Sequence, residues 1–311
     1  MVVIATLGLQ EFEGFAAGHN ACAGCLEALV LRHVLKEAGP KTIAVSATGC
    51  MEVVSSGFPQ TSWKIPWIHS AFENAPAVAS GIDKALKALG KREGINLIVF
   101  AGDGATFDIG FQALSGAIER NHKFLYVVTD NEAYANTGVQ RSSASFPFSN
   151  TSTTPAGKKI HGKIEPKKPV DLIIAAHGLP YVATATPANP QDLARKVKKA
   201  LAYNGPTFLH VYSPCPRGWS YETSSGVDLA RLAVQSNVFP LFEIEKGVLS
   251  FTQKISKESV KPVGEYLKMQ GRFKHLTPEL TNQVQEYVDA RYSFLEGIEG
   301  KKAFDVLYPG V

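Results

Sequence analysis

The stretch Asn96-Leu-Ile-Val-Phe-Ala-Gly-Asp-Gly104 decides the fold class of this 311-residue chain. Its first six residues form an almost continuous apolar run, which is typical of a strand buried on both faces of a parallel sheet. The run ends directly in a Gly-Asp-Gly turn, and ligands of open parallel sheets collect at the carboxyl ends of the strands. The stretch therefore predicts a central strand that delivers a polar turn to a binding edge.

Outward from this strand, short apolar strands alternate with helices along most of the chain. Further strands are expected at residues 42–45, 124–129, 181–185 and 207–212, and helices at 26–36, 72–89, 109–120, 170–177 and 190–203. This alternation predicts an α/β fold with an open parallel sheet flanked by helices. A long polar stretch at 132–166 interrupts the pattern, and structureless loops of that length in compact domains are usually functional.

The character of the sequence changes after about Ser224. A helix is expected at 227–235, a strand at 241–244, and charged, mostly helical sequence at 262–299. These amphipathic pieces are poorly supplied with a core of their own, so we interpret them as an extension that contacts other subunits. We therefore divide the chain into an α/β domain at 1–224 and a C-terminal extension at 225–311.

Composition and charge exclude several classes of protein. The net charge of +4 and the pI near 8.7 are too small a surplus, and too scattered, to indicate nucleic-acid binding. No apolar run approaches the length of a transmembrane helix, and the apolar start at 1–10 lacks the basic region of a secretory signal. We expect a cytoplasmic protein that binds neither membrane nor nucleic acid.

The first group of candidate site residues lies at two successive strand ends. The Gly102-Asp103-Gly104 turn lets backbone N–H groups approach a diphosphate, whose charge a helix N-terminus can meet. Asp103, Asn131 after the next strand, and the carbonyl of Ala133 offer the oxygen ligands that Mg²⁺ prefers. This order of elements resembles the thiamine diphosphate motif, with Asp130 in the place of the motif's first Asn.

The second group consists of the four cysteines, Cys22, Cys25, Cys50 and Cys215. Disulfides are not expected in a reducing cytoplasm, in a chain long enough to fold without them. One C-x-x-C pair with two distant cysteines suits a site with four thiolates, holding either zinc or an iron–sulfur cluster. Because the ligands come from three separated places, the spacing favours a cluster held by the fold over a local zinc knuckle.

A series of short motifs then extends through much of the chain. In chain order these motifs are Ala17-Gly-His19, Cys22-Ala-Gly-Cys25, Thr48-Gly-Cys-Met-Glu-Val53, Pro66-Trp-Ile-His69, Phe72-Glu-Asn-Ala75, Gly102-Asp-Gly104, Asp108-Ile-Gly110, Gln112-Ala-Leu-Ser-Gly116, Asn131-Glu-Ala-Tyr-Ala-Asn-Thr-Gly-Val-Gln-Arg-Ser142 and Pro214-Cys-Pro216. Together they resemble the β subunit of the pyruvate (2-oxoacid):ferredoxin oxidoreductase family, over about residues 18–230. The resemblance implies the diphosphate half of a thiamine diphosphate-binding fold.

The resemblance also implies the cofactors and the residues that hold them. The four cysteines would hold one [4Fe–4S] cluster, and Asp103, Asn131 and Ala133 would hold Mg²⁺ on thiamine diphosphate. The other residues expected along the cofactor are Thr48, Gly49, Cys50, Gly102, Gly104, Ala105, Asn136 and Thr137. Asn136 would face the substrate and is the expected catalytic residue.

Such a chain would be active only with partner subunits. The resemblance implies an α subunit that supplies a glutamate to the pyrimidine half of the cofactor. It also implies γ and ferredoxin-like δ subunits, or their fused equivalents, and ferredoxin as the electron acceptor. Pyruvate is the expected 2-oxoacid, and coenzyme A would accept the acyl group.

Departures from the family's pattern leave alternatives open. The chain has Leu26 where the family usually has Gly, Gln60 in place of an aromatic residue, and Ala105 and Phe107 after the Gly-Asp-Gly turn. Oxalate or 2-oxoisovalerate is therefore an alternative substrate. A non-redox thiamine decarboxylase or synthase would leave the cysteines unexplained, and a simple iron–sulfur carrier would leave the diphosphate motif unexplained.

Three histidines are further candidates for a functional role. His19 precedes the cysteine pair, where packing or a bond to a cofactor are both reasonable roles. His69 and Glu73 stand one helical turn apart, and we expect a structural or cofactor-facing role for this pair. His161, with Lys158 and Lys159 beside it, is expected at the solvated surface.

Overall fold

One eight-stranded sheet organises the computed structural model, which describes residues 8–57 and 59–304, with strand order β2-β1-β3-β4-β6-β5-β7-β8. The parallel strands are β1 (Thr42–Ala47), β2 (Trp67–Ser70), β3 (Asn96–Gly102), β4 (Leu125–Asp130), β5 (Tyr181–Ala185) and β6 (Thr207–Tyr212). The antiparallel β7 (Leu241–Glu245) and β8 (Val248–Gln253) continue the sheet beyond β5. The open, mostly parallel sheet expected from the sequence is confirmed.

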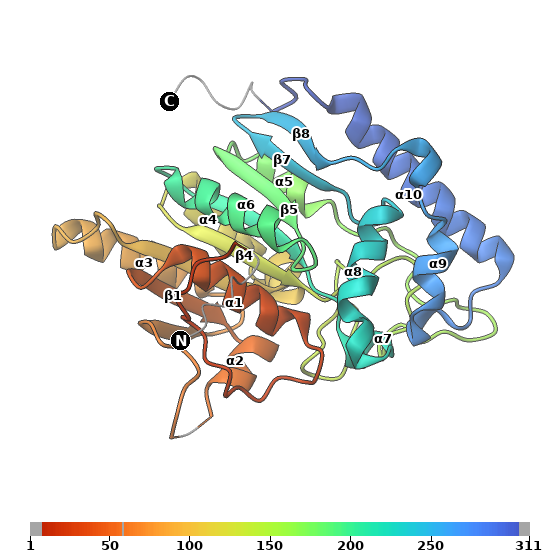
Figure 1. The fold of residues 1–311 in the computed structure, drawn as a ribbon, viewed down its shortest axis with the longest axis horizontal. Coiled ribbons are helices and arrows are strands. Elements are labelled where there is room, and N and C mark those ends of the chain that lie inside the picture. Colours follow the sequence, from red (N-terminus) through yellow and green to blue (C-terminus); the bar gives the residue numbers. More distant parts are fainter. Residues whose placement is uncertain (1–7, 58, 305–311) are drawn as a thin grey trace.

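Helices cover both faces of this sheet (Figure 1). α1 (Leu26–Ala38) and α6 (Pro190–Ala202) pack on the face that carries Ile98 and Phe100. α3 (Ala75–Ala88), α4 (Phe111–Glu119) and α5 (Val170–Ala175) pack on the face that carries Leu97 and Val99. Because successive strand residues point to opposite faces and both faces are buried, β3 is apolar from Leu97 to Ala101.

The segment after Ser224 shares the core of the α/β body. α8 (Gly226–Gln235), α9 (Val263–Lys268) and α10 (Pro278–Ile298) surround an apolar cluster that also contains Tyr212 and Trp219. Side chains of β7, β8 and the end of α10 join the core beside α3, α4 and α5. The role of 225–311 in subunit contacts stays a prediction, and residues 1–7 and 305–311 lie outside the described part of the chain.

Several short elements were not expected from the sequence. They are α2 (Cys50–Ser55), β2, α7 (Pro216–Trp219), β8 and a π-helix at Gly104–Ile109. Elements of four to six residues carry too few positions to establish a period, which is why the pattern missed most of them. The helix expected at 72–89 begins at Ala75, and the one expected from 109 is preceded by the π-helix, a rare element that is frequent at functional sites.

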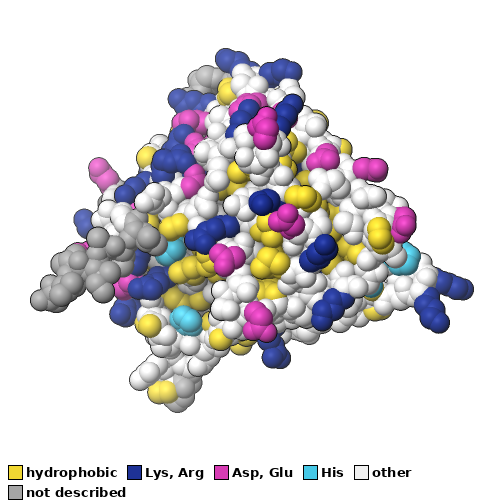
Figure 2. All heavy atoms as spheres, turned by 45° about the vertical axis from the view of Figure 1, so that its right-hand side comes forward, with side chains coloured by type: hydrophobic (Ala, Val, Ile, Leu, Met, Phe, Trp, Pro, Cys, Tyr) yellow, Lys and Arg dark blue, Asp and Glu magenta, His cyan; other side chains and the backbone are white. Residues whose placement is uncertain are grey.

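The surface agrees with the scattered charge of the sequence. Lys and Arg side chains alternate with Asp and Glu on the face shown in Figure 2, and apolar side chains lie between them. Within the described residues, no helix is both long enough and apolar enough to cross a membrane.

Candidate functional site

Four strands deliver the candidate residues to one edge of the sheet. β1 leads into Thr48, β3 into Asp103, β4 into Asn131, and β6 into the segment that holds Cys215. These strands are neighbours in the order β1-β3-β4-β6 and run parallel, so their carboxyl ends lie side by side. The structure thus brings together residues that are far apart in the sequence, at the edge where α/β proteins bind ligands.

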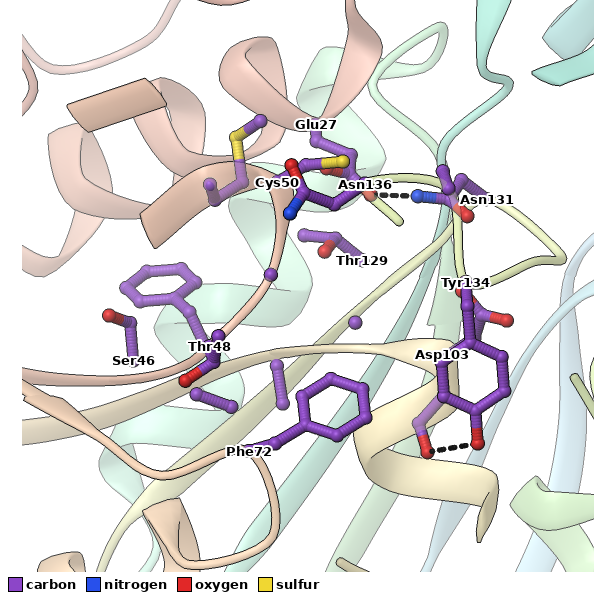
Figure 3. A pocket seen from close by; sticks show the side chains of 18 of the residues that line it. Glu27, Ser46, Thr48, Cys50, Phe72, Asp103, Thr129, Asn131, Tyr134 and Asn136 are labelled. Atoms are coloured by element: carbon purple, nitrogen blue, oxygen red, sulfur yellow. Dashed lines mark hydrogen bonds between the residues drawn. The ribbon is translucent and has the colours of Figure 1, made fainter. Parts of the chain in front are cut away.

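A cavity of about 80 Å³ opens at the ends of β1, β3 and β4 (Figure 3). The predicted cofactor-binding residues that line it are Thr48, Gly49, Cys50, Gly102, Asp103, Gly104, Asn131, Ala133, Asn136 and Thr137. Ala105 is instead buried in the core below α4, so a contact of Ala105 with the cofactor stays a prediction. We call this space the diphosphate cavity.

Asp103 is the carboxylate of the diphosphate cavity's central turn, and its side chain is buried. Its Oδ2 accepts a hydrogen bond of 2.5 Å from Ser142 Oγ, whereas Oδ1 is buried with no hydrogen-bond partner among the described residues. Burial raises the pKa of Asp103 well above its usual range, and the charge of Asp130 raises it further. A buried carboxylate with one unpaired oxygen is the kind of group that a divalent cation would satisfy.

Asn131 is held from three sides. Its amide Nδ2 donates to Glu27 Oε1 at 2.5 Å, its Oδ1 accepts from the N–H of Ala133 at 3.2 Å, and its carbonyl accepts from Trp219 Nε1 at 2.8 Å. Because the amide nitrogen is bound to Glu27 and Oδ1 accepts only the bond from Ala133 among these contacts, the second lone pair of Oδ1 can bind a cation. The Asn131–Ala133 segment is therefore a well-fixed oxygen donor beside Asp103.

Glu27 is a site residue that sequence reasoning missed. It follows the C-x-x-C pair in the first turn of α1 and is buried, lining the diphosphate cavity on one side. Burial raises the pKa of Glu27 to about 7, with the hydrogen bond from Asn131 acting in the opposite direction. An acidic residue in a first helical turn is so common that the sequence offers no signal of this contact.

Gly104 leaves room for an aromatic wall of the diphosphate cavity. A Cβ on Gly104 would lie 2.4 Å from Cε1 of Tyr134, so any larger residue would displace that ring. Tyr134 is in turn fixed by a 3.0 Å hydrogen bond from its hydroxyl to Asp108 and by its contact with Phe72. The glycine of the Gly-Asp-Gly turn is thus required by packing against the segment that follows β4.

The four cysteines line a second cavity, of about 440 Å³, directly beside the first. Cys22 lies in the loop before α1, Cys25 precedes α1, Cys50 begins α2, and Cys215 precedes α7. All four are free thiols. Cys50, Glu27, Asn131 and Asn136 line both cavities. The structure therefore gathers all four predicted cluster ligands and gives the two cavities a common wall. We call this space the cysteine cavity.

The C-x-x-C loop has its own stereochemical requirement. Gly24 has a φ of +76°, and a Cβ there would lie 2.2 Å from the carbonyl oxygen of Thr223. Only glycine combines that backbone conformation with such a close approach. The Ala-Gly pair between Cys22 and Cys25 therefore fixes the loop against the segment that leads into α8.

Three thiols of the cysteine cavity, those of Cys25, Cys50 and Cys215, are costly to ionise without a metal. Burial, followed by the charge of Glu27, raises the pKa of Cys25 to about 12 and that of Cys50 further. Burial likewise raises the pKa of Cys215 to about 11. Because thiolates are the ligating form, loading of a metal would release protons from this cavity. Across residues 8–57 and 59–304, no three His, Cys, Asp or Glu side chains are arranged to hold a single metal ion.

The structure corrects the expectation for His69 and Glu73. His69 lies on β2 rather than on a helix, and its Nε2 lies 2.7 Å from Thr48 Oγ1. Its Nδ1 lies 3.8 Å from Glu52 Oε1, so Glu52 and not Glu73 is the neighbouring acid. The helical spacing was misleading because the strand β2 is too short to recognise. His69 therefore contacts a residue at the rim of the diphosphate cavity.

The other two histidines lie outside both cavities. His19 stacks on Phe15 and accepts a hydrogen bond from the N–H of Ala21, so it orders the loop before the cysteine pair. His161 is partly buried, and its carbonyl oxygen lies 3.2 Å from His275 Nε2. Packing and loop structure thus account for both residues.

Comparison with known proteins agrees with this geometry. The family model for the thiamine pyrophosphate enzyme, C-terminal TPP binding domain, matches residues 47–211. Pyruvate synthase subunit PorB of Methanocaldococcus jannaschii is 53% identical over 289 residues, which cover 91% of this chain and 96% of that protein. The chain belongs to the β-subunit family of the 2-oxoacid:ferredoxin oxidoreductases. Members of this family are oxidoreductase subunits that act together with partner subunits.

One more curated relative and one solved structure extend the comparison. Ketoisovalerate oxidoreductase subunit VorB of Pyrococcus abyssi is 46% identical over 286 residues, covering 91% of this chain and 92% of that protein. The solved structure of a 2-oxoglutarate:ferredoxin oxidoreductase from Magnetococcus marinus superimposes with a TM-score of 0.55 at 21% identity, covering 92% of this chain and 89% of that chain. The latter match shows a shared fold.

Proposed function

We propose that this chain is the β subunit of a pyruvate:ferredoxin oxidoreductase. The observation that carries the proposal is the common wall between the diphosphate cavity and the cysteine cavity, which Cys50 and Asn136 line from both sides. Thiamine diphosphate, when bound, supplies a nucleophilic carbon and an electron sink for cleavage of a 2-oxoacid. A one-electron acceptor in the adjacent cavity would then be in reach of that centre.

We propose that Asp103, Asn131 and Ala133 hold Mg²⁺ in the diphosphate cavity. The unpaired Oδ1 of Asp103 and the amide of Asn131, oriented by Glu27, support this assignment. Thr48, Gly49 and the Gly102–Gly104 turn would then lie along the diphosphate and its thiazolium ring. The chain's own role is to supply oxygen ligands, to exclude water and to fix the cofactor against the cysteine cavity.

We propose that Cys22, Cys25, Cys50 and Cys215 hold one [4Fe–4S] cluster. Four free thiols that come from three separate places in the chain line one cavity, and they are the donor set of a cubane cluster. A non-redox thiamine decarboxylase would leave this cavity without a purpose. An electron carrier without thiamine would leave the diphosphate cavity without one.

The remaining partners follow from the family. An α subunit would provide the glutamate for the pyrimidine half, γ and δ subunits or their fused equivalents would lead electrons to ferredoxin, and coenzyme A would take the acyl group. Pyruvate is the proposed substrate, since the relatives named pyruvate synthase include the 53% identical PorB. The 46% identical VorB makes 2-oxoisovalerate the second candidate.

A panel assay of the assembled complex tests the substrate. We expect viologen reduction with pyruvate to exceed that with 2-oxoisovalerate, 2-oxoglutarate and oxalate, and to depend on coenzyme A. The same assay without coenzyme A separates oxalate, which yields only carbon dioxide and has no acyl group to transfer. A preference for a branched 2-oxoacid would replace pyruvate by 2-oxoisovalerate.

Replacing Asn136 by alanine is expected to lower turnover by about 100-fold or more while leaving thiamine diphosphate affinity near wild type. Asn136 lines both cavities, where its amide can donate to the oxyanion that develops on the substrate carbonyl. The turn itself is closed by Thr137 and Gln140, through contacts of 2.6 and 2.7 Å, so it does not depend on Asn136.

Single-turnover cluster reduction and cofactor affinity on the same Asn136→Ala complex check this expectation. Gln140→Ala, which opens the turn, serves as the comparison. A parallel loss of affinity and rate in Asn136→Ala, as expected for Gln140→Ala, would reassign Asn136 to a structural role.

A further inference from the structure

Two buried acids flank Asn131, and the proposed ligand set uses neither of them. Asp130 and Glu132 are almost completely buried. The backbone φ of Glu132 is +61°, a value that residues other than glycine rarely adopt. A backbone held in this region persists only where surrounding contacts determine it. Groups around the segment must therefore hold it in place.

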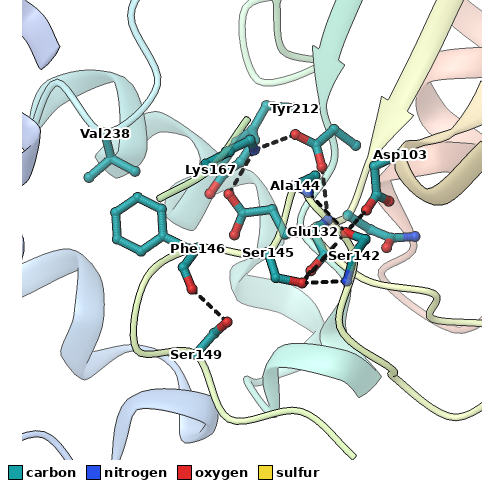
Figure 4. A network of polar contacts seen from close by, with 12 residues as sticks. Asp103, Glu132, Ser142, Ala144, Ser145, Phe146, Ser149, Lys167, Tyr212 and Val238 are labelled. Carbon is teal, nitrogen blue, oxygen red and sulfur yellow. Dashed lines mark hydrogen bonds and ion pairs between the residues drawn. The ribbon is translucent and has the colours of Figure 1, made fainter. Parts of the chain in front are cut away.

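Two buried cations hold the acids, and His210 Nε2 also lies 2.7 Å from Asp130 Oδ2 (Figure 4 shows the part around Lys167). Lys167, at the end of the long loop after β4, binds Asp130 and also contacts Glu132 Oε1 at 3.0 Å. Arg272 contacts Glu132 Oε2 at 2.7 Å. Glu132 is thus bound by one cation from the α/β body and by one from the C-terminal extension.

Arg272 also stacks on the ring of Trp219. It lies in the turn between α9 and α10, and the centre of its guanidinium group stands 3.6 Å from the centroid of the Trp219 ring. Its Nε donates to Gln270 Oε1 at 2.9 Å, which fixes the plane of the group. A planar cation can stack on an aromatic ring and bind a carboxylate at the same time.

Trp219 connects this contact to both cavities. It is the last residue of α7, the short helix that Cys215 precedes, and its Nε1 donates to the carbonyl of Asn131 at 2.8 Å. Arg272 therefore contacts Glu132 on one side of Asn131 and, through Trp219, the Asn131 carbonyl on the other.

Two serines extend the same path to Asp103. Ser145 Oγ donates to the carbonyl of Glu132 at 2.6 Å and accepts from the N–H of Ser142 at 3.0 Å. Ser142 Oγ in turn donates to Asp103 Oδ2 (Figure 4). Both proposed side-chain ligands of magnesium are thus linked to Glu132, and Glu132 to Arg272.

We propose that Arg272, contributed by the C-terminal extension, is a positioning residue that couples the magnesium-binding segment to the helix that follows Cys215. This inference rests on the proposed function, since it assigns Arg272 to the same two cofactor sites. A buried ion pair is by itself weak evidence for a role in stability. Here the pair and the stacking contact converge on the strained Glu132 and on its neighbour Asn131, which lines both cavities. Positioning is therefore the role assigned.

The test compares Arg272→Lys with Trp219→Phe in the complex assembled with its partner subunits. Lysine keeps the charge beside Glu132 but loses the planar stacking contact, and phenylalanine keeps the ring but loses the hydrogen bond to Asn131. Arg231→Lys on α8 is the matched control, because Arg231 forms its ion pair with Asp228 at the surface, away from both cavities. The readouts are Mn²⁺ affinity in the presence of thiamine diphosphate, by electron paramagnetic resonance, and the spectrum of the reduced cluster.

We expect Arg272→Lys and Trp219→Phe each to weaken Mn²⁺ binding at least about tenfold and to alter the cluster spectrum, as losses behind metal ligands do. The fold-loss of Mn²⁺ affinity in the double variant should be smaller than the product of the two single fold-losses, because both residues act through one path. Arg231→Lys should match wild type. A thermal unfolding scan of each complex separates these effects from unfolding.

Wild-type Mn²⁺ affinity and an unchanged cluster spectrum in folded Arg272→Lys would overturn the inference while leaving the proposed function intact. If Arg272→Lys does not assemble, unchanged Mn²⁺ affinity in Trp219→Phe overturns it equally. A wild-type complex that binds neither Mn²⁺ with thiamine diphosphate nor a cluster would instead overturn the proposed function.

Discussion

Replacing Asp103 by alanine is expected to lower the affinity of the assembled enzyme for thiamine diphosphate and magnesium by more than about 100-fold, with the iron content unchanged. Asp103 supplies the only carboxylate of the Gly102–Gly104 turn, and its Oδ1 is buried with no hydrogen-bond partner in the part of the chain that the structure describes. A cation bound there would compensate for the burial of that charge, and alanine would remove the charge on which the cation depends. Asp103 does not line the cysteine cavity, so we expect the cluster to be retained in the Asp103→Ala variant.

Asp103→Asn makes the experiment sharper. Asparagine keeps the shape of the side chain and an oxygen that can accept the hydrogen bond from Ser142, but it has no charge. Asp228→Ala is the control, since Asp228 is an exposed acid with a surface ion pair. Calorimetric titration of thiamine diphosphate with magnesium should rank wild type and Asp228→Ala above Asp103→Asn and then Asp103→Ala. Equal affinities across this series would remove Asp103 from the ligand set.

The sequence predicts the sheet and the position of the site for a physical reason. A strand buried on both faces must be apolar throughout, so residues 96–101 identify the centre of a parallel sheet without any tertiary information. Parallel strands then place their carboxyl ends at one edge, which brings Asp103 next to Asn131 and Cys50. The spacing of the four cysteines predicts one shared cavity in the same way.

The residues that the sequence does not reveal act through contacts between distant segments. Glu27 reads as an ordinary acid in a first helical turn, yet it is buried against Asn131. Arg272 reads as one of many scattered basic residues, and only the packing of the extension places it on Trp219 and Glu132. Burial of a charge in a fold depends on its partners, and sequence periodicity carries no information about partners.

Replacing Cys215 by alanine is expected to remove or convert the cluster, although Cys215 lies 165 residues after Cys50 in the sequence. The four thiols line one cavity, and a cubane cluster that loses one of four thiolate ligands loses an iron or its stability. Iron analysis and the reduced-state paramagnetic signal of anaerobically purified complex measure the loss. Metal analysis that gives about one zinc and no iron in wild type would show a zinc site instead.

Cys215 has a structural role that the experiment must separate from ligation. Its Sγ accepts a hydrogen bond from the N–H of Gly218 at 3.3 Å and so caps the start of α7. Serine at this position preserves the cap, because its hydroxyl oxygen also accepts, but it is a poor ligand for iron compared with a thiolate. If ligation is the role, Cys215→Ser and Cys215→Ala should lose the cluster signal alike, with the serine variant closer to wild type in thermal stability. If Cys215→Ser retains iron and signal while Cys215→Ala loses both, the cap accounts for the effect and the four-cysteine site is wrong.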